Sequence, residues 1–183
     1  MVKRIIEPFF VKKMHDTVNI QGGNIMAIGQ FVKFLVGNEE FGVNIKQVRE
    51  IIKLQEFLKV PNTPAFIEGL INLRGKVLTV FNLRKRLGLK NHKFNDNSKI
   101  IIVDLNNIPI GFTVDLVSEI VRISDDNIEN TPPSVTSIDK RFLSGVAKLD
   151  EKLILMLDLT KVLSTEEEIK VKKFIEKNES NIV

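Results

Sequence analysis

The sequence predicts a mainly β protein made of two small β-barrels of similar design. Short apolar stretches alternate with tight polar turns along most of the 183 residues. The connections between them are too short for the helical crossovers of a parallel α/β sheet, which favours barrels. The chain also repeats itself: residues 42–51 match residues 111–120, and residues 66–87 match residues 142–163. Repeats separated by 69 and 76 residues indicate two similar lobes, because solenoid repeats span only about 20–50 residues.

The matching positions of the two copies hold mostly apolar residues and glycine. Examples, first copy before second, are Gly42 and Gly111, Val48 and Val117, Glu50 and Glu119, Gly69 and Gly145, and Lys76 and Lys152. One position changes charge, because Asp150 stands where the first copy has Arg74. This divergence is expected if each lobe faces a different partner; the alternative is drift at an exposed turn. Two like lobes also leave a groove between them, a usual place for ligands and partners.

The first unit is expected to contain four strands and little helix. Its predicted strands are residues 30–36, 41–45, 66–73 and 76–81. Val48, Ile51 and Ile52 recur at helical spacing, which predicts a short helix or helical turn over Lys46–Lys53. Asn82–Leu87 ends at Gly88, a residue that favours the end of a short helix.

The second unit follows the same plan after a polar, Asn-rich linker at residues 90–98. Its predicted strands are residues 99–105, 108–114, 142–149 and 153–157, with turns at Asn106-Asn107 and Asp150-Glu151. A proline-containing connector covers residues 124–133. The pattern leaves open whether the strands of one lobe are completed by chain from the other half.

The chain divides into three parts. Residues 1–28 lie outside the repeat and are expected to form a loosely ordered lead-in. Residues 29–164 carry the two repeat units, at about 30–90 and 99–164. Residues 165–183 are expected to form a C-terminal helix and tail. Ser164-Thr-Glu-Glu167 has the sequence of a capping box, and the acidic start and Lys-rich end of this segment suit the helix dipole.

The composition excludes several classes of function. There is no apolar run long enough to span a bilayer and no signal-peptide pattern at the N-terminus. The chain has no Cys, and its two His residues lack a metal-ligand spacing partner. No phosphate-binding glycine loop or nucleophile elbow is present. We therefore expect no catalytic residues, no cofactor and no metal.

Several segments resemble the CheW family of bacterial chemotaxis coupling proteins. They are residues 42–51, 64–75, 114–120 and 142–149 together with Leu157-Asp-Leu159, and Asn72-Leu-Arg-Gly75 is the most specific of the motifs. The resemblance covers roughly residues 29–164. It implies two SH3-like five-stranded β-barrel subdomains beside a hydrophobic groove. The expected fold adds a few short helices and the C-terminal helix, which is extra or elongated relative to the family. The same module ends the kinase CheA and begins CheV, but this chain has no room for a kinase or receiver domain.

The resemblance also implies partners and a location. A stand-alone coupler joins the cytoplasmic tip of chemoreceptors (methyl-accepting chemotaxis proteins) to the regulatory domain of a CheA-type histidine kinase, without catalysis. Other CheW-like modules can join it in rings, in the cytoplasm beneath receptor arrays, without membrane insertion. The alternative hypothesis is a pair of nucleic-acid-binding barrels, suggested by the net charge of +4. Phe is the only aromatic residue type, and it falls mostly in predicted strand cores, which argues against that alternative.

By resemblance, the receptor-binding residues are Val48, Glu50, Gly69, Arg74 and Val117. The matching Glu and Arg of the family lie together beside the receptor-binding groove. The positions that match Val48 and Val117 contribute to this apolar groove, and the resemblance implies that a side chain at Gly69 would fill it. Each residue has a simpler structural interpretation. Glu50 and Arg74 could be an ordinary exposed ion pair, Val48 and Val117 could be core residues, and Gly69 could serve the backbone alone.

Overall fold

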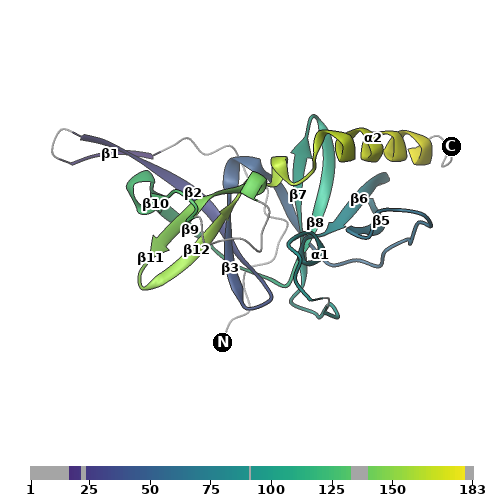
Figure 1. The fold of residues 1–183 in the computed structure, drawn as a ribbon, viewed down its shortest axis with the longest axis horizontal. Helices are drawn as coiled ribbons and strands as arrows, with labels where there is room; N and C mark the ends of the chain where they lie inside the picture. The colour runs from purple at the N-terminus through teal and green to yellow at the C-terminus, as the bar shows by residue number, and fades with distance from the viewer. Residues whose placement is uncertain (1–16, 22–23, 91, 133–139, 180–183) are drawn as a thin grey trace.

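In the computed structural model, residues 17–21, 24–90, 92–132 and 140–179 are described, and they form two β-sheet lobes lying side by side (Figure 1). Lobe A is a sheet of seven strands in the order β1-β2-β3-β12-β11-β10, with β9 also paired to β2. Lobe B is a sheet of five strands in the order β4-β7-β8-β6-β5. The predicted mainly β architecture is confirmed.

The element bounds match most of the predicted segments. Lobe A consists of β1 (Thr17–Gln21), β2 (Asn24–Val36), β3 (Glu39–Asn44), β9 (Leu116–Ser124), β10 (Ile128–Glu129), β11 (Leu143–Leu149) and β12 (Lys152–Leu157). Lobe B consists of β4 (Val48–Lys53), β5 (Ile67–Leu73), β6 (Lys76–Asn82), β7 (Lys99–Leu105) and β8 (Ile108–Val114). The helices are α1 (Leu83–Arg86) and α2 (Thr165–Glu179), with short 3-10 turns at Ile45–Gln47, Asp125–Asn127, Lys140–Phe142 and Leu159–Lys161.

The two repeat units exchange strands. Lobe A takes β2 and β3 from the first unit and β9 to β12 from the second. Lobe B takes β4 to β6 from the first unit and β7 and β8 from the second. The chain crosses between the lobes at Ile45–Gln47 and again at Asp115. Each repeat unit is therefore divided between the lobes. This answers the question of strand exchange that the sequence leaves open.

The lobes have the same pairing and the same irregularities. Gly42 of β3 pairs in parallel with Met156 of β12, as its equivalent Gly111 of β8 pairs with Val80 of β6. The strand pair β4–β7 shifts register between Val48 and Glu50, and β2–β9 shifts at the equivalent place. The hairpins β5–β6 and β11–β12 also share a bulge before their equivalent glycines. The predicted equivalence of topology is confirmed down to the residue register.

The prediction of a helix over Lys46–Lys53 is wrong beyond the 3-10 turn at its start, because most of the segment is strand β4. Ile51 packs against the core shared by both lobes, whereas Ile52 packs against the interior of lobe B. A strand covered by apolar groups on both faces holds consecutive isoleucines, and such a run is not distinguished from helical spacing by periodicity alone. The equivalent strand β9 was not predicted at all.

The expected loosely ordered lead-in is wrong for part of residues 1–28. Thr17–Gln21 forms β1, which pairs antiparallel with the first residues of β2. Residues 1–16 lie outside the described residues. The helix predicted at Asn82–Leu87 is present as α1, and Gly88 follows it with a φ of +71°.

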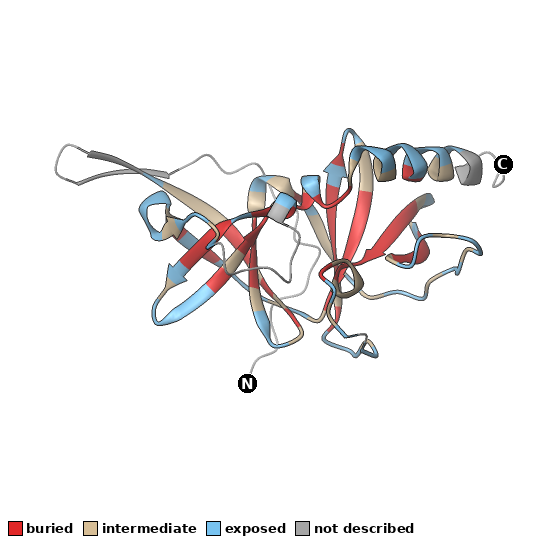
Figure 2. Cartoon of the chain, viewed as in Figure 1, coloured by how far each residue is buried: buried red, intermediate tan, exposed pale blue. Residues whose placement is uncertain are grey.

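Buried residues lie in the strands of both lobes (Figure 2). Within the described residues they form three apolar clusters. The interior of lobe A contains Phe31, Val121, Ile123, Ala147, Ile154 and Met156. The interior of lobe B contains Ile71, Leu78, Val80, Ile100 and Ile102, four of which are repeat equivalents of lobe A residues. The largest cluster spans both lobes and includes Phe34, Phe41, Phe81, Phe112 and Phe142, so the lobes share one core.

Helix α2 begins with the predicted capping box. Ser164 N donates to Glu167 Oε2 at 2.7 Å, and Glu167 N donates to Ser164 Oγ at 3.3 Å. Arg86 of α1 donates two hydrogen bonds, of 2.9 and 2.8 Å, to the carboxylate of Glu167. Its Nε donates to the carbonyl oxygen of Val162. Burial would raise the pKa of Glu167, but these hydrogen bonds and the Arg86 charge lower it. This bidentate pair anchors the start of α2 beside lobe B.

Candidate partner-binding surface

The predicted pair Glu50 and Arg74 is in contact. Arg74 Nη2 lies 2.8 Å from Glu50 Oε2, and the arginine side chain is 64% exposed. Arg74 and Gly75 are the two central residues of the β5–β6 turn, with φ of +53° and +83°, and Gly75 N donates to Asn72 Oδ1. Positive φ at both positions is the pattern of a two-residue hairpin turn. The turn thus holds a cation against Glu50 of β4, at the mouth of the lobe B barrel.

In lobe A a different residue pairs with the equivalent carboxylate. Its equivalent carboxylate, Glu119, lies 2.7 Å from Lys33 Nζ, and Lys33 occupies the position that Ile102 holds in lobe B. The hydrogen bond to Glu119 raises the pKa of Lys33 against the effect of burial. Asp150, with a φ of +53°, keeps the backbone shape of Arg74 but reverses its charge. The two barrel mouths therefore present different charges on the same backbone.

The predicted apolar residues lie mainly in the shared core. Val48 is 5% exposed and pairs with Val103, so it offers almost no surface to a partner. Val117 is half-buried opposite Phe34 and packs against the same cluster. The core interpretation therefore describes Val48, while Val117 retains some accessible surface.

The backbone at position 69 requires glycine. Its φ is +156°, and a Cβ there would lie 2.7 Å from the carbonyl oxygen of Leu58. Gly145 is equivalent, with a φ of +159° and a Cβ position 2.8 Å from the carbonyl oxygen of Glu129. Both glycines let a preceding segment lie across the hairpin. The expectation that a side chain at Gly69 would fill an open groove is wrong, because it would first strike the Leu58 backbone.

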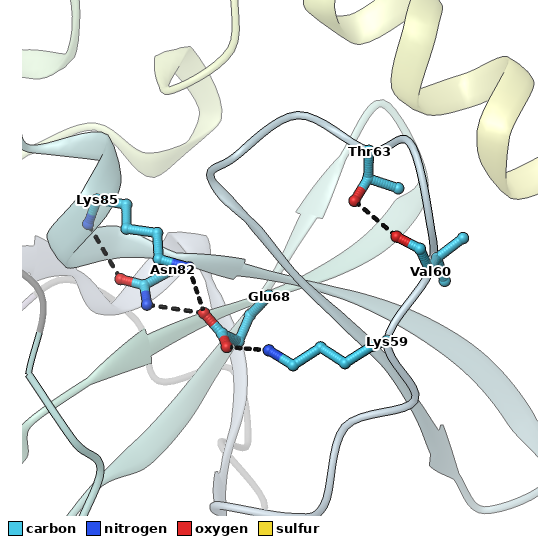
Figure 3. Close-up of polar contacts among 6 residues, drawn as sticks. All are labelled: Lys59, Val60, Thr63, Glu68, Asn82 and Lys85. Carbon is cyan, nitrogen blue, oxygen red and sulfur yellow. Dashed lines mark hydrogen bonds and ion pairs between the residues drawn. The ribbon is translucent and has the colours of Figure 1, made fainter.

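A buried carboxylate in lobe B was missed by the sequence reasoning (Figure 3). Glu68 is 7% exposed and accepts hydrogen bonds from Lys59 Nζ at 2.5 Å, Asn82 Nδ2 at 2.8 Å and Lys85 Nζ at 3.1 Å. Burial would raise the pKa of Glu68, but these donors outweigh it and lower the pKa. The available signal was a single acidic residue in a strand whose other residues, apart from Asn72, are apolar or glycine.

Lobe A has a lysine at the position equivalent to Lys85, but its carboxylate is at a different position from Glu68. Asp158 stands at the position of Asn82, Lys161 at that of Lys85, and Ser144 at that of Glu68. Asp158 Oδ2 lies 3.2 Å from Lys161 Nζ, and Asp158 Oδ1 accepts from Gln47 Nε2 at 2.9 Å. The pKa of Asp158 is lowered, because hydrogen bonds from Thr160 and Lys161 outweigh the effect of burial. Through Gln47, this network fixes the first crossover between the lobes.

The second crossover is fixed in a similar way. Asp115 Oδ2 accepts from Gly37 N at 2.6 Å and forms an ion pair with Arg84 of α1. Both connections between the lobes are therefore held by a side chain, and the shared core lies between them. Such an arrangement gives the two barrel mouths a fixed relative position.

The described residues contain no group of three or more His, Cys, Asp or Glu side chains placed to hold a metal ion. No helix within the described part of the chain is long and apolar enough to cross a membrane.

Comparison with known proteins defines the class of protein. The model of the CheW-like domain matches residues 30–167, which include lobe B, lobe A except β1 and the first residues of β2, and the start of α2. The chain belongs to the CheW family, a family of chemotaxis scaffold proteins that are not enzymes.

Individual relatives agree. The chain is 31% identical over 150 residues to the chemotaxis protein CheW of Bacillus subtilis, covering 82% of this chain and 93% of that protein. It is 35% identical over 138 residues to CheW of Rhizobium meliloti, covering 75% and 89%. A solved structure of the scaffolding protein TtCheW from Thermoanaerobacter tengcongensis matches with a TM-score of 0.72 at 36% identity, covering 85% of this chain and 96% of that one.

Proposed function

We propose that this protein is a chemotaxis adaptor that couples the cytoplasmic tips of chemoreceptors to the regulatory domain of a CheA-type histidine kinase. It acts without catalysis, in the cytoplasm at receptor arrays. The observation that carries the proposal is the Glu50–Arg74 pair, an exposed arginine held on a barrel mouth that the equivalent lobe does not reproduce. The pair matches the receptor-site Glu and Arg of the CheW family.

The proposed receptor surface centres on Glu50 and Arg74, with Val117 as its accessible apolar residue. Val48 and Gly69 support this surface indirectly. Val48, the first residue of β4, packs in the shared core, and Gly69 leaves room for the backbone at Leu58. The kinase domain binds elsewhere, at a barrel end, because an adaptor must hold both partners at once. A rigid connection between the lobes suits this role, since a shift of one partner then changes the contacts of the other.

The test measures both affinities on one folded variant. Arg74→Glu places two carboxylates together, and we expect it to weaken binding of a receptor cytoplasmic fragment by roughly 1–3 kcal/mol, measured by calorimetry. Binding of the kinase regulatory domain stays nearly unchanged. Asp150→Arg is the matched control for the receptor, because it changes charge at the equivalent turn of lobe A. An equal loss for both partners would show one shared surface and overturn the adaptor proposal.

No observation favours the nucleic-acid alternative. Four of the arginines, Arg49, Arg74, Arg84 and Arg86, each form an ion pair with a carboxylate.

A further inference from the structure

The first hairpin of lobe A extends past the rest of its sheet. Strand β2 pairs with β3 from Phe31 onward and with β9 from Ile28 onward. Before Ile28 it pairs with β1 alone among the described strands. Figure 1 shows this β1–β2 ribbon (residues 17–21 and 24–28) projecting from the end of lobe A. The ribbon precedes residues 30–167, the part that matches the CheW-like domain, so it lies outside the shared domain.

One face of the β1–β2 ribbon is apolar. Val18 lies opposite Ala27, and Ile20 lies opposite Ile25. Directly opposed residues of a sheet share a face and successive residues alternate, so these four residues lie on the same face and Asn19 lies on the other. Ala27 is exposed, so the body of lobe A does not cover the apolar face at that residue.

The outer edge of β1 is open to another strand. No described strand pairs with β1 on the side away from β2. Natural edge strands usually carry charges, proline or a bulge that prevents such pairing. Residues 17–32 contain no charged residue and no proline, although 27% of the whole chain is charged, and the register of β1 with β2 has no shift. Since a two-stranded ribbon alone is only marginally stable, this edge favours a partner that supplies further strands.

Strand β1 of a second copy is complementary to this edge. When two β1 strands pair antiparallel about a two-fold axis at Asn19, Val18 of each copy lies opposite Ile20 of the other. The apolar faces of the two ribbons then join into one face that is four strands wide. Asn19 meets its own equivalent on the other face. An unrelated strand would have to reproduce this pattern, whereas an identical copy has it already.

The direction of β1 keeps the two bodies apart. Thr17 pairs with Ile28, next to the body of lobe A, and Gln21 pairs with Asn24 at the tip of the ribbon. Antiparallel pairing therefore sets the tip of one ribbon beside the base of the other. The two lobe A barrels lie at opposite ends of the joined sheet and do not collide.

We propose that two copies of this chain associate edge to edge through β1, forming a four-stranded sheet between their A lobes. A strand of five residues is about 17 Å long, so the contact is smaller than a standard interface and the dimer is weak and reversible. The proposal goes beyond the adaptor function, because it joins two copies through residues outside the CheW-like domain. The Glu50–Arg74 pair lies on the other lobe and takes no part in this contact.

The test follows the mass of the full chain by sedimentation equilibrium over a range of protein concentrations. We expect a monomer–dimer equilibrium with a dissociation constant between about 10 µM and 1 mM. Asn19→Lys and Asn19→Asp each set two like charges directly opposite each other, so each variant alone should associate about 5-fold more weakly. An equimolar mixture of the two variants should regain the parent affinity, because lysine then faces aspartate across the axis.

The matched controls are Asn38→Lys and Asn38→Asp. Asn38 is exposed in the β2–β3 turn, away from the ribbon, and the two changes alter the net charge by the same amounts. They should leave the association unchanged, both singly and mixed. Amide hydrogen exchange gives an independent readout, because exchange in β1 should slow as the concentration rises while exchange in β5 should not.

Several outcomes would overturn the proposal. One is a chain that stays monomeric up to about 1 mM. Another is a dimer that neither Asn19 variant weakens, or a mixture that associates no better than the separate variants. If the Asn38 variants behaved like the Asn19 variants, net charge would govern the association and pairing through β1 would be excluded. The experiment uses no receptor or kinase, so its failure and that of the adaptor proposal are separate results.

Discussion

Lobe A and lobe B share strand order, register and bulges, but they place their charges differently. Lobe B sets Arg74 on a hairpin turn to meet Glu50, whereas lobe A sets Lys33 in the barrel wall to meet Glu119. Lobe B buries a carboxylate on β5, Glu68, whereas lobe A places one after β12, Asp158. The backbone of the ancestral unit has been retained while its polar residues moved. Differences between the lobes therefore indicate where each has acquired its own contacts.

The largest expected effect tests what the lobes still share. Gly69→Ala and Gly145→Ala should each destabilise the fold by roughly 2–3 kcal/mol, because each adds a Cβ within 2.8 Å of a backbone oxygen at a strained φ. Urea denaturation measures the change. Gly75→Ala is the control: it has a positive φ but no atom within 4 Å of its Cβ position, so about 1 kcal/mol is expected. A Gly69→Ala variant that stays fully stable yet fails to bind receptor would restore the open-groove interpretation.

The buried carboxylates provide the next comparison. Glu68→Gln leaves Lys59 and Lys85 facing a neutral amide in a buried network, which should cost about 1–3 kcal/mol in unfolding free energy. Asp158→Asn should cost a similar amount. Glu50→Gln should cost less than about 1 kcal/mol, since its partner Arg74 is exposed. If Glu50→Gln proved as harmful as Glu68→Gln, the distinction between structural and surface pairs would fail.

The stability of the fold at acid pH should depend on the carboxylates whose pKa values are lowered. The folded pKa values of Glu68, Asp158 and Glu167 are lowered from ordinary values of 4.5, 3.8 and 4.5. Stability from such groups is complete above their unfolded pKa and is lost as pH falls through the folded pKa. We expect urea midpoints to be flat near neutral pH and to fall below about pH 4.5. Glu68→Gln should make that fall shallower, and an unchanged slope would exclude Glu68 as a source of it.

The smallest effect concerns the barrel mouths. Lys33→Ile gives lobe A the residue that lobe B has at Ile102, and it leaves Glu119 unpaired but 58% exposed. We expect a change in unfolding free energy within about 1 kcal/mol, because an apolar residue can replace a half-buried ion pair at little cost. Thermal denaturation of the variant and the parent at matched pH measures it. A loss of several kcal/mol would mean that the two barrel interiors are not interchangeable at this position.

Sequence reasoning predicted the hairpins well because turn residues and alternation are local signals. Asn106, Asn107 and Asp150 stand at the predicted turns with positive φ, and the flanking strands have the expected bounds to within one residue. It failed at β4, where Ile51 and Ile52 pack against different clusters and local periodicity does not separate strand from helix. It also missed β9, which is largely exposed and gives no regular alternation of apolar and polar residues. The exchange of strands depends on pairing across the whole chain, which no local pattern encodes.

The candidate site was predicted in part. Glu50 and Arg74 meet as expected, because the family motif fixes a turn that faces β4. Val48 and Gly69 are expected at the groove. Residue type does not reveal that Val48 is buried or that the Leu58 backbone approaches Gly69, because both depend on the tertiary structure. Glu68 was overlooked because its partners Lys59 and Lys85 lie on both sides of it in sequence and meet it only in the fold.

The exchange of strands also fixes the order in which the molecule can form during synthesis. Lobe B uses one continuous stretch, from Val48 to Val114, so all its strands have been made before β9 leaves the ribosome. Lobe A must wait, because Gly42 of β3 finds its partner Met156 only after β12 has been synthesised. Until then the β2–β3 hairpin carries an unpaired edge, the kind of exposed strand from which aggregation begins. A nascent chain stalled before β12 should thus hold a closed lobe B beside an open lobe A.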